Sequence, residues 1–173
     1  MQFQLNFFSK TLRAKFLKIP YCWLPMKPIV LYASKSGNTK KIADAIALEQ
    51  NCESLKITQT RTVDLSSYDL IFIGTGIHFG NPNEDITNFL KTANIKEPKL
   101  FTVFLTWGGA GKTDQEAIAK LKIILEAKGQ KLVADVFKCY GGRQFTFLRR
   151  GHPNEEDAKA AREWSKKIVN KNQ

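Results

Sequence analysis

The sequence predicts an α/β fold in which helices cover both faces of a parallel β-sheet. From Ile29 onward, short β-branched and apolar runs alternate with longer amphipathic segments. Near-continuous apolar runs are typical of strands buried on both faces, and their alternation with helical patterns is typical of βαβ units. The expected strands are Ile29–Ala33, Ser54–Ile57, Leu70–Gly74, Leu100–Thr106 and Lys131–Phe137.

Four helices are expected between and after these strands. The first runs from Asn38 to Glu49 and the last from Glu155 to Asn170, with Asn154 as its N-cap. The other two are predicted by apolar residues at helical spacing, which are Ile86, Phe89, Leu90 and Ala93 in one and Ile118, Leu121 and Leu125 in the other. Only Thr58–Asp69 separates the second and third strands, which leaves too little room for a full crossover helix.

The composition predicts one globular domain, because 173 residues with 43% hydrophobic content can bury a sizeable core. We expect this domain over residues 28–173, preceded by a basic extension over residues 1–27. The extension carries apolar Phe8, Leu12 and Phe16 among lysines and one arginine, which suits a helix on a membrane surface. A disordered tail is the second alternative. A start codon assigned too far upstream is the third, because Met26 stands directly before the first strand.

The net charge of +11 suits nucleic acid, an anionic membrane or an acidic protein partner, whereas lysines scattered along helix patterns are also typical of a solvated face. Residues 1–27 account for +5 of this charge and leave +6 on the predicted domain. No nucleic-acid recognition motif is present, so nucleic acid is not expected as a partner. Cys22, Cys52 and Cys139 lie far apart without a metal-ligand spacing, which favours a reducing cytoplasm and no metal site. No membrane-spanning run can be drawn through the chain.

A loop that could bind an anion follows the first predicted strand. It consists of Ser34, Lys35, Ser36, Gly37, Asn38 and Thr39 and leads directly into a helix. Hydroxyl groups, backbone N–H groups and the positive end of the helix dipole are the donors that a terminal phosphate requires. The alternative is an ordinary helix cap formed by Ser36 or Asn38.

A glycine-containing loop follows the third predicted strand and runs from Gly74 to Asn83. Glycines permit close approach of the main chain to a flat ligand, and His78 or Phe79 could cover a ring face. The loop differs from the dinucleotide pattern G-x-G-x-x-G by one extra residue before Gly80 and follows the wrong strand for it. The alternative is an exposed loop without a ligand.

The third loop runs from Thr106 to Thr113 after the fourth predicted strand. It resembles the phosphate-binding pattern G-x-x-x-x-G-K-[ST], except that Thr106 replaces the first glycine and Trp107 would crowd a phosphate. Trp107 stacked on an aromatic ligand is the competing interpretation, and a hydrophobic plug at the sheet edge is the third. Nucleotide hydrolysis through Lys112 is therefore a minor alternative.

Together the three loops resemble the FMN site of the flavodoxin family. The motif [ST]-x-[ST]-G-N-T is met by Ser34, Ser36, Gly37, Asn38 and Thr39, and the resemblance covers about residues 28–170. It implies a flavodoxin-like three-layer α/β/α sandwich with a five-stranded parallel sheet of order 2-1-3-4-5.

The resemblance also implies the residues that bind FMN. Ser34 to Thr39 would hold the phosphate, and two loops would enclose the isoalloxazine ring. These loops supply Thr75, Gly76, Ile77, His78 and Phe79, and Thr106, Trp107, Gly108 and Gly109. Flavodoxins often place a Trp and a Tyr beside the ring, whereas the first of these loops offers only His78 and Phe79.

The implied function is electron transfer between redox protein partners, with the flavin supplying the chemistry and no catalytic residue required. Flavodoxins are typically acidic, and carboxylates near the ring repel the anionic, fully reduced flavin. In this basic chain we therefore expect full reduction of the flavin to be easier. We also expect a partner with an acidic docking face. The alternative is an enzyme of the same fold, such as an NAD(P)H-dependent quinone or flavin reductase or a protoporphyrinogen oxidase. The long segment Lys138–His152, with its arginines and aromatic residues, would then form a substrate wall. A domain of this fold without flavin is the remaining alternative.

Overall fold

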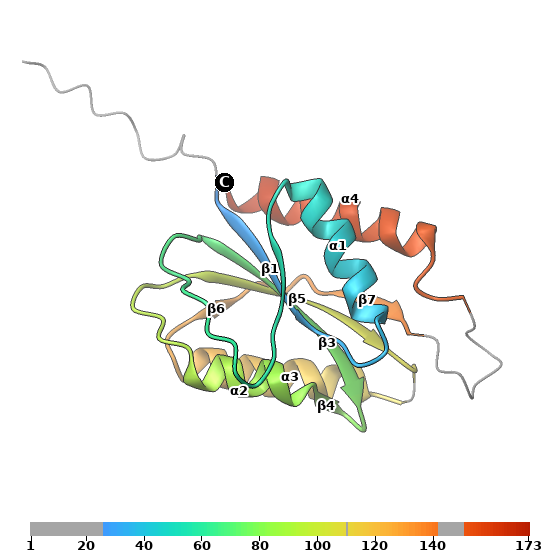
Figure 1. The fold of residues 1–173 in the computed structure, drawn as a ribbon, viewed down its shortest axis with the longest axis horizontal. Helices are drawn as coiled ribbons and strands as arrows, with labels where there is room; N and C mark the ends of the chain where they lie inside the picture. The colour runs from blue at the N-terminus through green and yellow to red at the C-terminus, as the bar shows by residue number, and fades with distance from the viewer. Residues whose placement is uncertain (1–25, 110, 142–150) are drawn as a thin grey trace, which may run out of the picture.

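A central β-sheet lies between two pairs of helices in the computed structural model, which describes residues 26–109, 111–141 and 151–173. Helices α1 (Asn38–Gln50) and α4 (Glu155–Asn172) lie together on one face of the sheet. Helices α2 (Glu84–Thr92) and α3 (Thr113–Glu126) cover the other face (Figure 1). The three-layer α/β/α architecture predicted from the sequence is confirmed.

The sheet has the predicted parallel order. Strand β2 (Ser54–Lys56) lies at one edge, followed by β1 (Pro28–Ala33), β3 (Leu70–His78) and β5 (Leu100–Trp107). Strands β6 (Lys131–Leu132) and β7 (Phe137–Tyr140) both pair in parallel with β5, at its start and at its end. Strand β5 is the fourth strand of the predicted order 2-1-3-4-5, and β6 and β7 together take the place of the fifth. The predicted order is therefore confirmed, although the sheet has more strands than the five expected.

The predicted fifth strand, Lys131–Phe137, is corrected to two shorter strands. Between them the chain stays beside β5 through two isolated hydrogen bonds. Val133 donates its N–H to the Phe101 carbonyl, and the Thr102 hydroxyl donates to the Asp135 carbonyl. The Asp135 carboxylate accepts a hydrogen bond from the Trp164 indole at 3.2 Å. Asp135 was expected inside a strand, and it lies instead in this interruption, where its carboxylate reaches the indole of α4.

The third strand is longer than predicted. It was expected to end at Gly74 but continues to His78 and turns back into β4 (Asn81–Pro82), so the second loop is a β-hairpin. Its two turn residues, Phe79 and Gly80, both have positive φ, +48° and +71°. Two positive φ values in a two-residue turn match the twist of a hairpin. Phe79 is unfavourable at such a φ, which explains why the sequence pattern did not indicate this turn.

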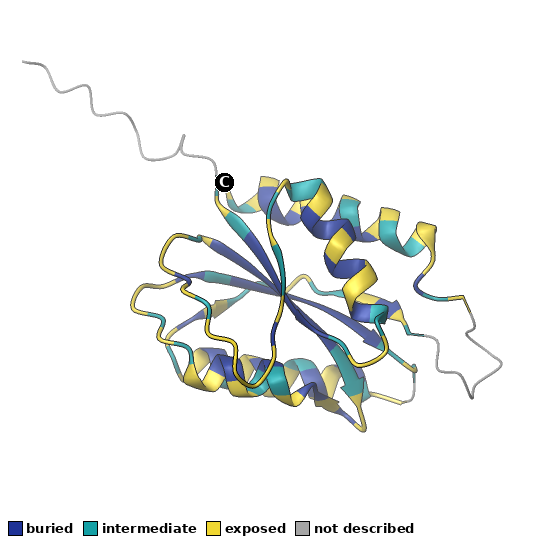
Figure 2. Ribbon diagram, in the orientation of Figure 1, coloured by how far each residue is buried: buried dark blue, intermediate teal, exposed yellow. Residues whose placement is uncertain are grey.

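Two hydrophobic clusters hold the helices on the sheet, and alternate residues of the central strands β1, β3 and β5 belong to one cluster or the other. Figure 2 shows that these central strands are buried along most of their length. In β1, Ile29 and Leu31 face α2 and α3, and Val30 and Tyr32 face α1 and α4. Because strand side chains alternate between faces, a strand buried on both sides must be apolar throughout. This explains the continuous apolar runs in the sequence.

The helices begin and end close to the predicted residues. Asn154 caps α4 as expected, in a reciprocal pair with Asp157. The described connection between β2 and β3 contains no crossover helix, as predicted from its length. The basic residues of segment 1–25 and the aromatic and arginine residues of segment 142–150 lie outside the described residues. Across the described part of the chain, no helix is long and apolar enough to span a membrane.

Candidate functional site

The first predicted loop forms a tight turn at the amino end of α1. The Gly37 N–H donates to the Ser34 hydroxyl oxygen at 3.0 Å, and Gly37 adopts a φ of +86°. A Cβ atom built on Gly37 would meet no described atom within 4 Å. The turn therefore opens the amino end of α1 toward free space, and it needs glycine for its backbone conformation.

The amino end of α1 differs from those of the other three described helices. The cap residue Gly37 provides no side chain to the first turn, and that turn contains no acidic residue. In α2 and α4, Asn83 and Asn154 cap the backbone N–H groups, and acidic residues follow in both. Helix α3 has Asp114 and Glu116 in its first turn. The free N–H groups at the amino end of a helix attract an anion. Of these four helices, only α1 has no acidic residue of its own in its first turn to provide that negative charge.

The three predicted loops meet at two threonine hydroxyls. Thr39 and Thr106 are both buried, and their Oγ1 atoms lie 2.9 Å apart. A Cβ atom on Gly76 would lie 3.6 Å from the Thr39 hydroxyl and 3.9 Å from the Thr106 hydroxyl. The first, second and third loops are thereby brought together at the carboxyl end of the parallel strands, as the sequence predicts.

Some side chains of the second loop point into the fold, and others are exposed at its tip. Thr75 is fully buried, and its hydroxyl donates to the Gly76 carbonyl and accepts from the Asn83 N–H at 2.8 Å. Ile77 packs against the core on the α2 and α3 face. These two side chains hold the hairpin in place and do not project from it. Phe79 is 93% exposed at the hairpin tip, and His78 precedes it.

An aromatic pair stands beside the third loop. The rings of Trp107 and Tyr140 are stacked, with centroids 6.4 Å apart and planes at 19°. The pairing of β7 with β5 places these residues opposite one another. Beyond Trp107, a Cβ atom on Gly108 would meet no described atom within 4 Å, and Gly109 has a φ of +72°. The third loop therefore places one ring of a stacked aromatic pair directly before a glycine segment whose backbone is accessible.

Tyr140 and Gly141 were not predicted as site residues. Gly141 donates its N–H to the Trp107 carbonyl at 2.9 Å, and a Cβ atom on it would lie 3.1 Å from the Asn38 side-chain nitrogen. The end of β7 thus reaches the first loop as well as the third. The glycine pair Gly141-Gly142 was the signal in the sequence. It was not placed here because the fifth strand was expected to end at Phe137.

A cluster of polar side chains lies behind Tyr140. His152 Nδ1 is 2.6 Å from the Asp157 carboxylate, and the His152 ring meets Tyr140 edge-on with centroids 6.1 Å apart. Burial would raise the pKa of Asp157, but bonds from the Asn154 N–H and from His152 outweigh it and lower that pKa. Burial and the nearby Asp157 raise the pKa of the Cys139 thiol to about 12, so this cysteine is a poor nucleophile.

The end of the third loop is fixed by an ion pair between α3 and β7. Lys138 Nζ lies 2.6 Å from the Asp114 carboxylate, whose side chain is 7% exposed. This carboxylate lies in the first turn of α3, where a nucleotide phosphate would have to bind in the alternative that uses Lys112. An anion is therefore already present at that helix end, which disfavours the nucleotide interpretation.

A flavodoxin-domain family model matches residues 29–150. The chain belongs to the flavodoxin family. The uncharacterized protein MJ0298 of Methanocaldococcus jannaschii is 33% identical over 155 residues, which are 83% of this chain and 99% of that protein. The flavodoxin-like domain-containing protein BilS of Clostridioides difficile is 30% identical over 122 residues, 67% of this chain and 66% of BilS. Oxidised flavodoxin 2 of Bacillus cereus has the same fold, with a TM-score of 0.67 and 24% identity over 84% of this chain and 99% of that one.

Family membership confirms the sequence-based recognition and, with it, FMN as the cofactor. The residues present fit that cofactor. The amino end of α1 provides N–H groups without a carboxylate, and the third loop provides an aromatic side chain followed by exposed backbone. A phosphate and a flat aromatic ring need these two environments.

Proposed function

We propose that this protein is an electron carrier that binds FMN across the three loops and passes electrons between redox proteins. The observation that carries the proposal is the amino end of α1, which lacks both a side-chain cap and an acidic residue and lies beside the joined loops. FMN supplies the redox chemistry when bound, so the protein's residues need only bind and orient it.

The first loop would hold the phosphate. The N–H groups at the start of α1 and the exposed Ser36 hydroxyl would donate hydrogen bonds to its oxygens, and exposed Lys35 would add positive charge. Ser34 would act indirectly, because its hydroxyl accepts the Gly37 N–H and shapes the turn. Thr39 would act in the same way by fixing the first loop to the third through Thr106.

The flavin ring would lie between the second and third loops. Trp107 would form one side of the site, backed by Tyr140, and the backbone of Gly108 and Gly109 would approach the polar edge of the ring. His78 and Phe79 would lie on the hairpin side. Tyr140 supplies an aromatic residue from β7 where many flavodoxins have one in the hairpin loop.

The redox partner is proposed to have an acidic docking face. The chain has a net charge of +11, and Lys35 and Lys112 are exposed in the loops that surround the proposed flavin. Opposite charges on the two proteins would accelerate their encounter, and salt would slow it. A cytoplasmic location is part of the proposal and is supported by Cys52 and Cys139, which are both unpaired thiols.

The proposal is tested by purifying the full chain and examining it for flavin. We expect a yellow protein that releases FMN, identified by mass, on denaturation. Chemically reduced protein should then reduce an added one-electron acceptor such as ferricyanide, without NADH or NADPH. A colourless protein that takes up no added FMN would contradict the proposal.

A second candidate, an NAD(P)H-dependent quinone or flavin reductase, is favoured by one observation. The His152–Asp157 pair lies directly behind Tyr140 and could exchange a proton near the proposed ring. Steady-state oxidation of NADH or NADPH with 1,4-benzoquinone, without any partner protein, tests this candidate. Turnover that falls in the His152→Gln variant would support the reductase over the carrier.

A further inference from the structure

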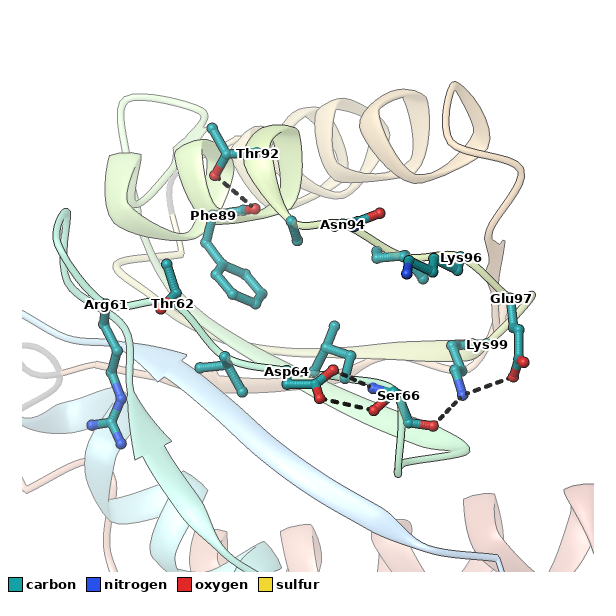
Figure 3. Close-up of a pocket in the computed structure, with 14 residues that line it drawn as sticks. Arg61, Thr62, Asp64, Ser66, Phe89, Thr92, Asn94, Lys96, Glu97 and Lys99 are labelled. Atoms are coloured by element: carbon teal, nitrogen blue, oxygen red, sulfur yellow. Dashed lines mark hydrogen bonds and ion pairs between the residues drawn. The ribbon is translucent and has the colours of Figure 1, made fainter.

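Figure 3 shows a hollow of about 650 Å³. Its lining segments precede strands β3 and β5, so it lies at the opposite end of the sheet from the three loops. Its walls come from residues 61–66, before β3, and from the end of α2 through residue 99, before β5. These segments precede their strands, whereas the proposed flavin site follows the strands. The hollow is thus a separate space, and its volume is in the range of small-molecule sites.

One part of the hollow is apolar. Leu65 is 2% exposed and Phe89 is 6% exposed, and both belong to the core on the α2 and α3 face. Val63, Ala93 and Ile95 are partly buried beside them and line the same space. In Figure 3 the Phe89 ring projects from α2 toward the segment that carries Asp64 and Ser66. A flat or branched apolar body would find contacts on these residues.

One end of the hollow holds a buried cation. The Lys99 side chain is only 7% exposed, and its Nζ donates a hydrogen bond to the Ser66 carbonyl at 3.0 Å. The Glu97 carboxylate lies 3.7 Å away, which is beyond hydrogen-bond length, and its side chain is 78% exposed. A lysine ammonium has three N–H donors, and burying it is costly unless they are used. Among the described residues, Lys99 makes one such bond.

The other acidic group of the hollow is already engaged. The two Asp64 oxygens accept the N–H and the hydroxyl of Ser66, each at 2.9 Å. The same hydrogen bonds lower the pKa of Asp64 and keep it ionised as the anchor of this turn. Lys96 and Arg61 line the hollow as exposed cations. Lys96 and Lys99 also help to lower the pKa of Asp64. A ligand that reaches Lys99 therefore meets an ammonium held by one hydrogen bond, to the Ser66 carbonyl, and one longer ion pair, to exposed Glu97.

We infer that this hollow is a second ligand site, for a small organic anion with an apolar ring or branched chain and one carboxylate. The apolar body would contact Phe89 and Leu65, and the carboxylate would accept hydrogen bonds from Lys99 Nζ. Lys96 would contribute charge from the rim. The site is independent of the flavin proposal, because it shares no residue with the three loops.

The test is isothermal titration calorimetry with 1-naphthoate on the full chain saturated with FMN. We expect saturable binding at one site, and binding of neutral 1-naphthalenemethanol at least about tenfold weaker, because a charge-assisted hydrogen bond is lost. Lys99→Met should weaken 1-naphthoate binding by about tenfold or more. Ala93→Phe, which fills the apolar part, should abolish it.

A matched control is Lys122→Met, which removes the same charge from an exposed lysine of α3 outside the hollow. This variant should bind 1-naphthoate as the original chain does, and all three variants should keep their FMN absorption spectrum. No saturable binding, or equal affinity for the acid and the alcohol, would overturn the inference. Unchanged affinity in Ala93→Phe would overturn it even where Lys99→Met fails to fold.

Discussion

Thr39 and Thr106 are joined by a buried hydrogen bond between their hydroxyl groups, 2.9 Å long, which ties the first loop to the third. Removing one hydroxyl leaves the other buried without this partner, which costs about 1–3 kcal/mol. We expect Thr39→Val and Thr106→Val each to lower the free energy of unfolding by that amount and to weaken FMN binding. Urea denaturation and titration of the apoprotein with FMN measure the two effects.

The double variant Thr39→Val/Thr106→Val serves as the control for this pair. With both hydroxyls replaced by methyl groups, no unpaired polar atom remains, so its loss of stability should be less than the sum of the two single losses. Strictly additive losses would mean that the two hydroxyls do not depend on one another.

Gly37 should affect the affinity for FMN as well as the stability of the fold. Its φ of +86° makes Gly37→Ala unfavourable by about 1–2 kcal/mol, and the added methyl group would enter the space proposed for the phosphate. We expect FMN affinity to fall by about tenfold or more, equivalent to about 1.4 kcal/mol. Quenching of FMN fluorescence during titration of the apoprotein measures this.

Gly129→Ala is the matched control for Gly37→Ala. Gly129 also has a positive φ, +68°, and a Cβ atom on it would likewise meet nothing within 4 Å. It follows α3 at a distance in sequence from all three loops. The two variants should lose similar stability, and only Gly37→Ala should lose FMN affinity. Equal affinity in both would remove Gly37 from the phosphate site.

Sequence reasoning placed the three loops at one edge because the carboxyl ends of parallel strands are adjacent by geometry. The apolar runs of β1 and β5 and the motif after β1 were sufficient for that. The hairpin was missed because Phe79 adopts a positive φ that its residue type disfavours. The position of Tyr140 beside Trp107, on which its proposed role rests, was not predicted. It depends on where the interrupted fifth strand resumes, and tertiary hydrogen bonds such as that from the Trp164 indole to Asp135 accompany the interruption.

Tyr140 should tune the bound flavin through Trp107. Its ring is stacked on Trp107 with centroids 6.4 Å apart, and an aromatic pair of this kind contributes about 0.5–1.5 kcal/mol beyond burial. We expect Tyr140→Leu to weaken FMN binding by about threefold to tenfold and to shift its reduction potentials. Potentiometric titration measures the shift. Tyr68→Leu, before β3 and away from the three loops, should leave both quantities unchanged, and a similar shift there would contradict the assignment.

Lys138 should stabilise the fold through Asp114 in a pH-dependent way. Burial would raise the pKa of Asp114, but the hydrogen bond from Lys138 and that from the Gln115 N–H outweigh it and lower this pKa below its ordinary value. A carboxyl with a lowered pKa in the folded state stabilises the fold above its unfolded pKa of about 3.9. This contribution is lost as the pH falls through the folded pKa.

We therefore expect Lys138→Met to destabilise the protein at pH 7 and to approach the original chain in stability below about pH 4. A hydrogen bond between charged groups contributes about 1.5–3 kcal/mol, and because Lys138 is 40% exposed we expect the lower end, about 1.5 kcal/mol. Lys122→Met is the control, since Lys122 lies 3.6 Å from Glu126 and both side chains are more than half exposed. Exposed pairs of this kind contribute about 0.5 kcal/mol or less. Urea denaturation at pH 7 and below about pH 4 measures the free energy of unfolding of both variants. Equal losses of this free energy at pH 7 would show that the burial of Asp114 does not strengthen its pair with Lys138.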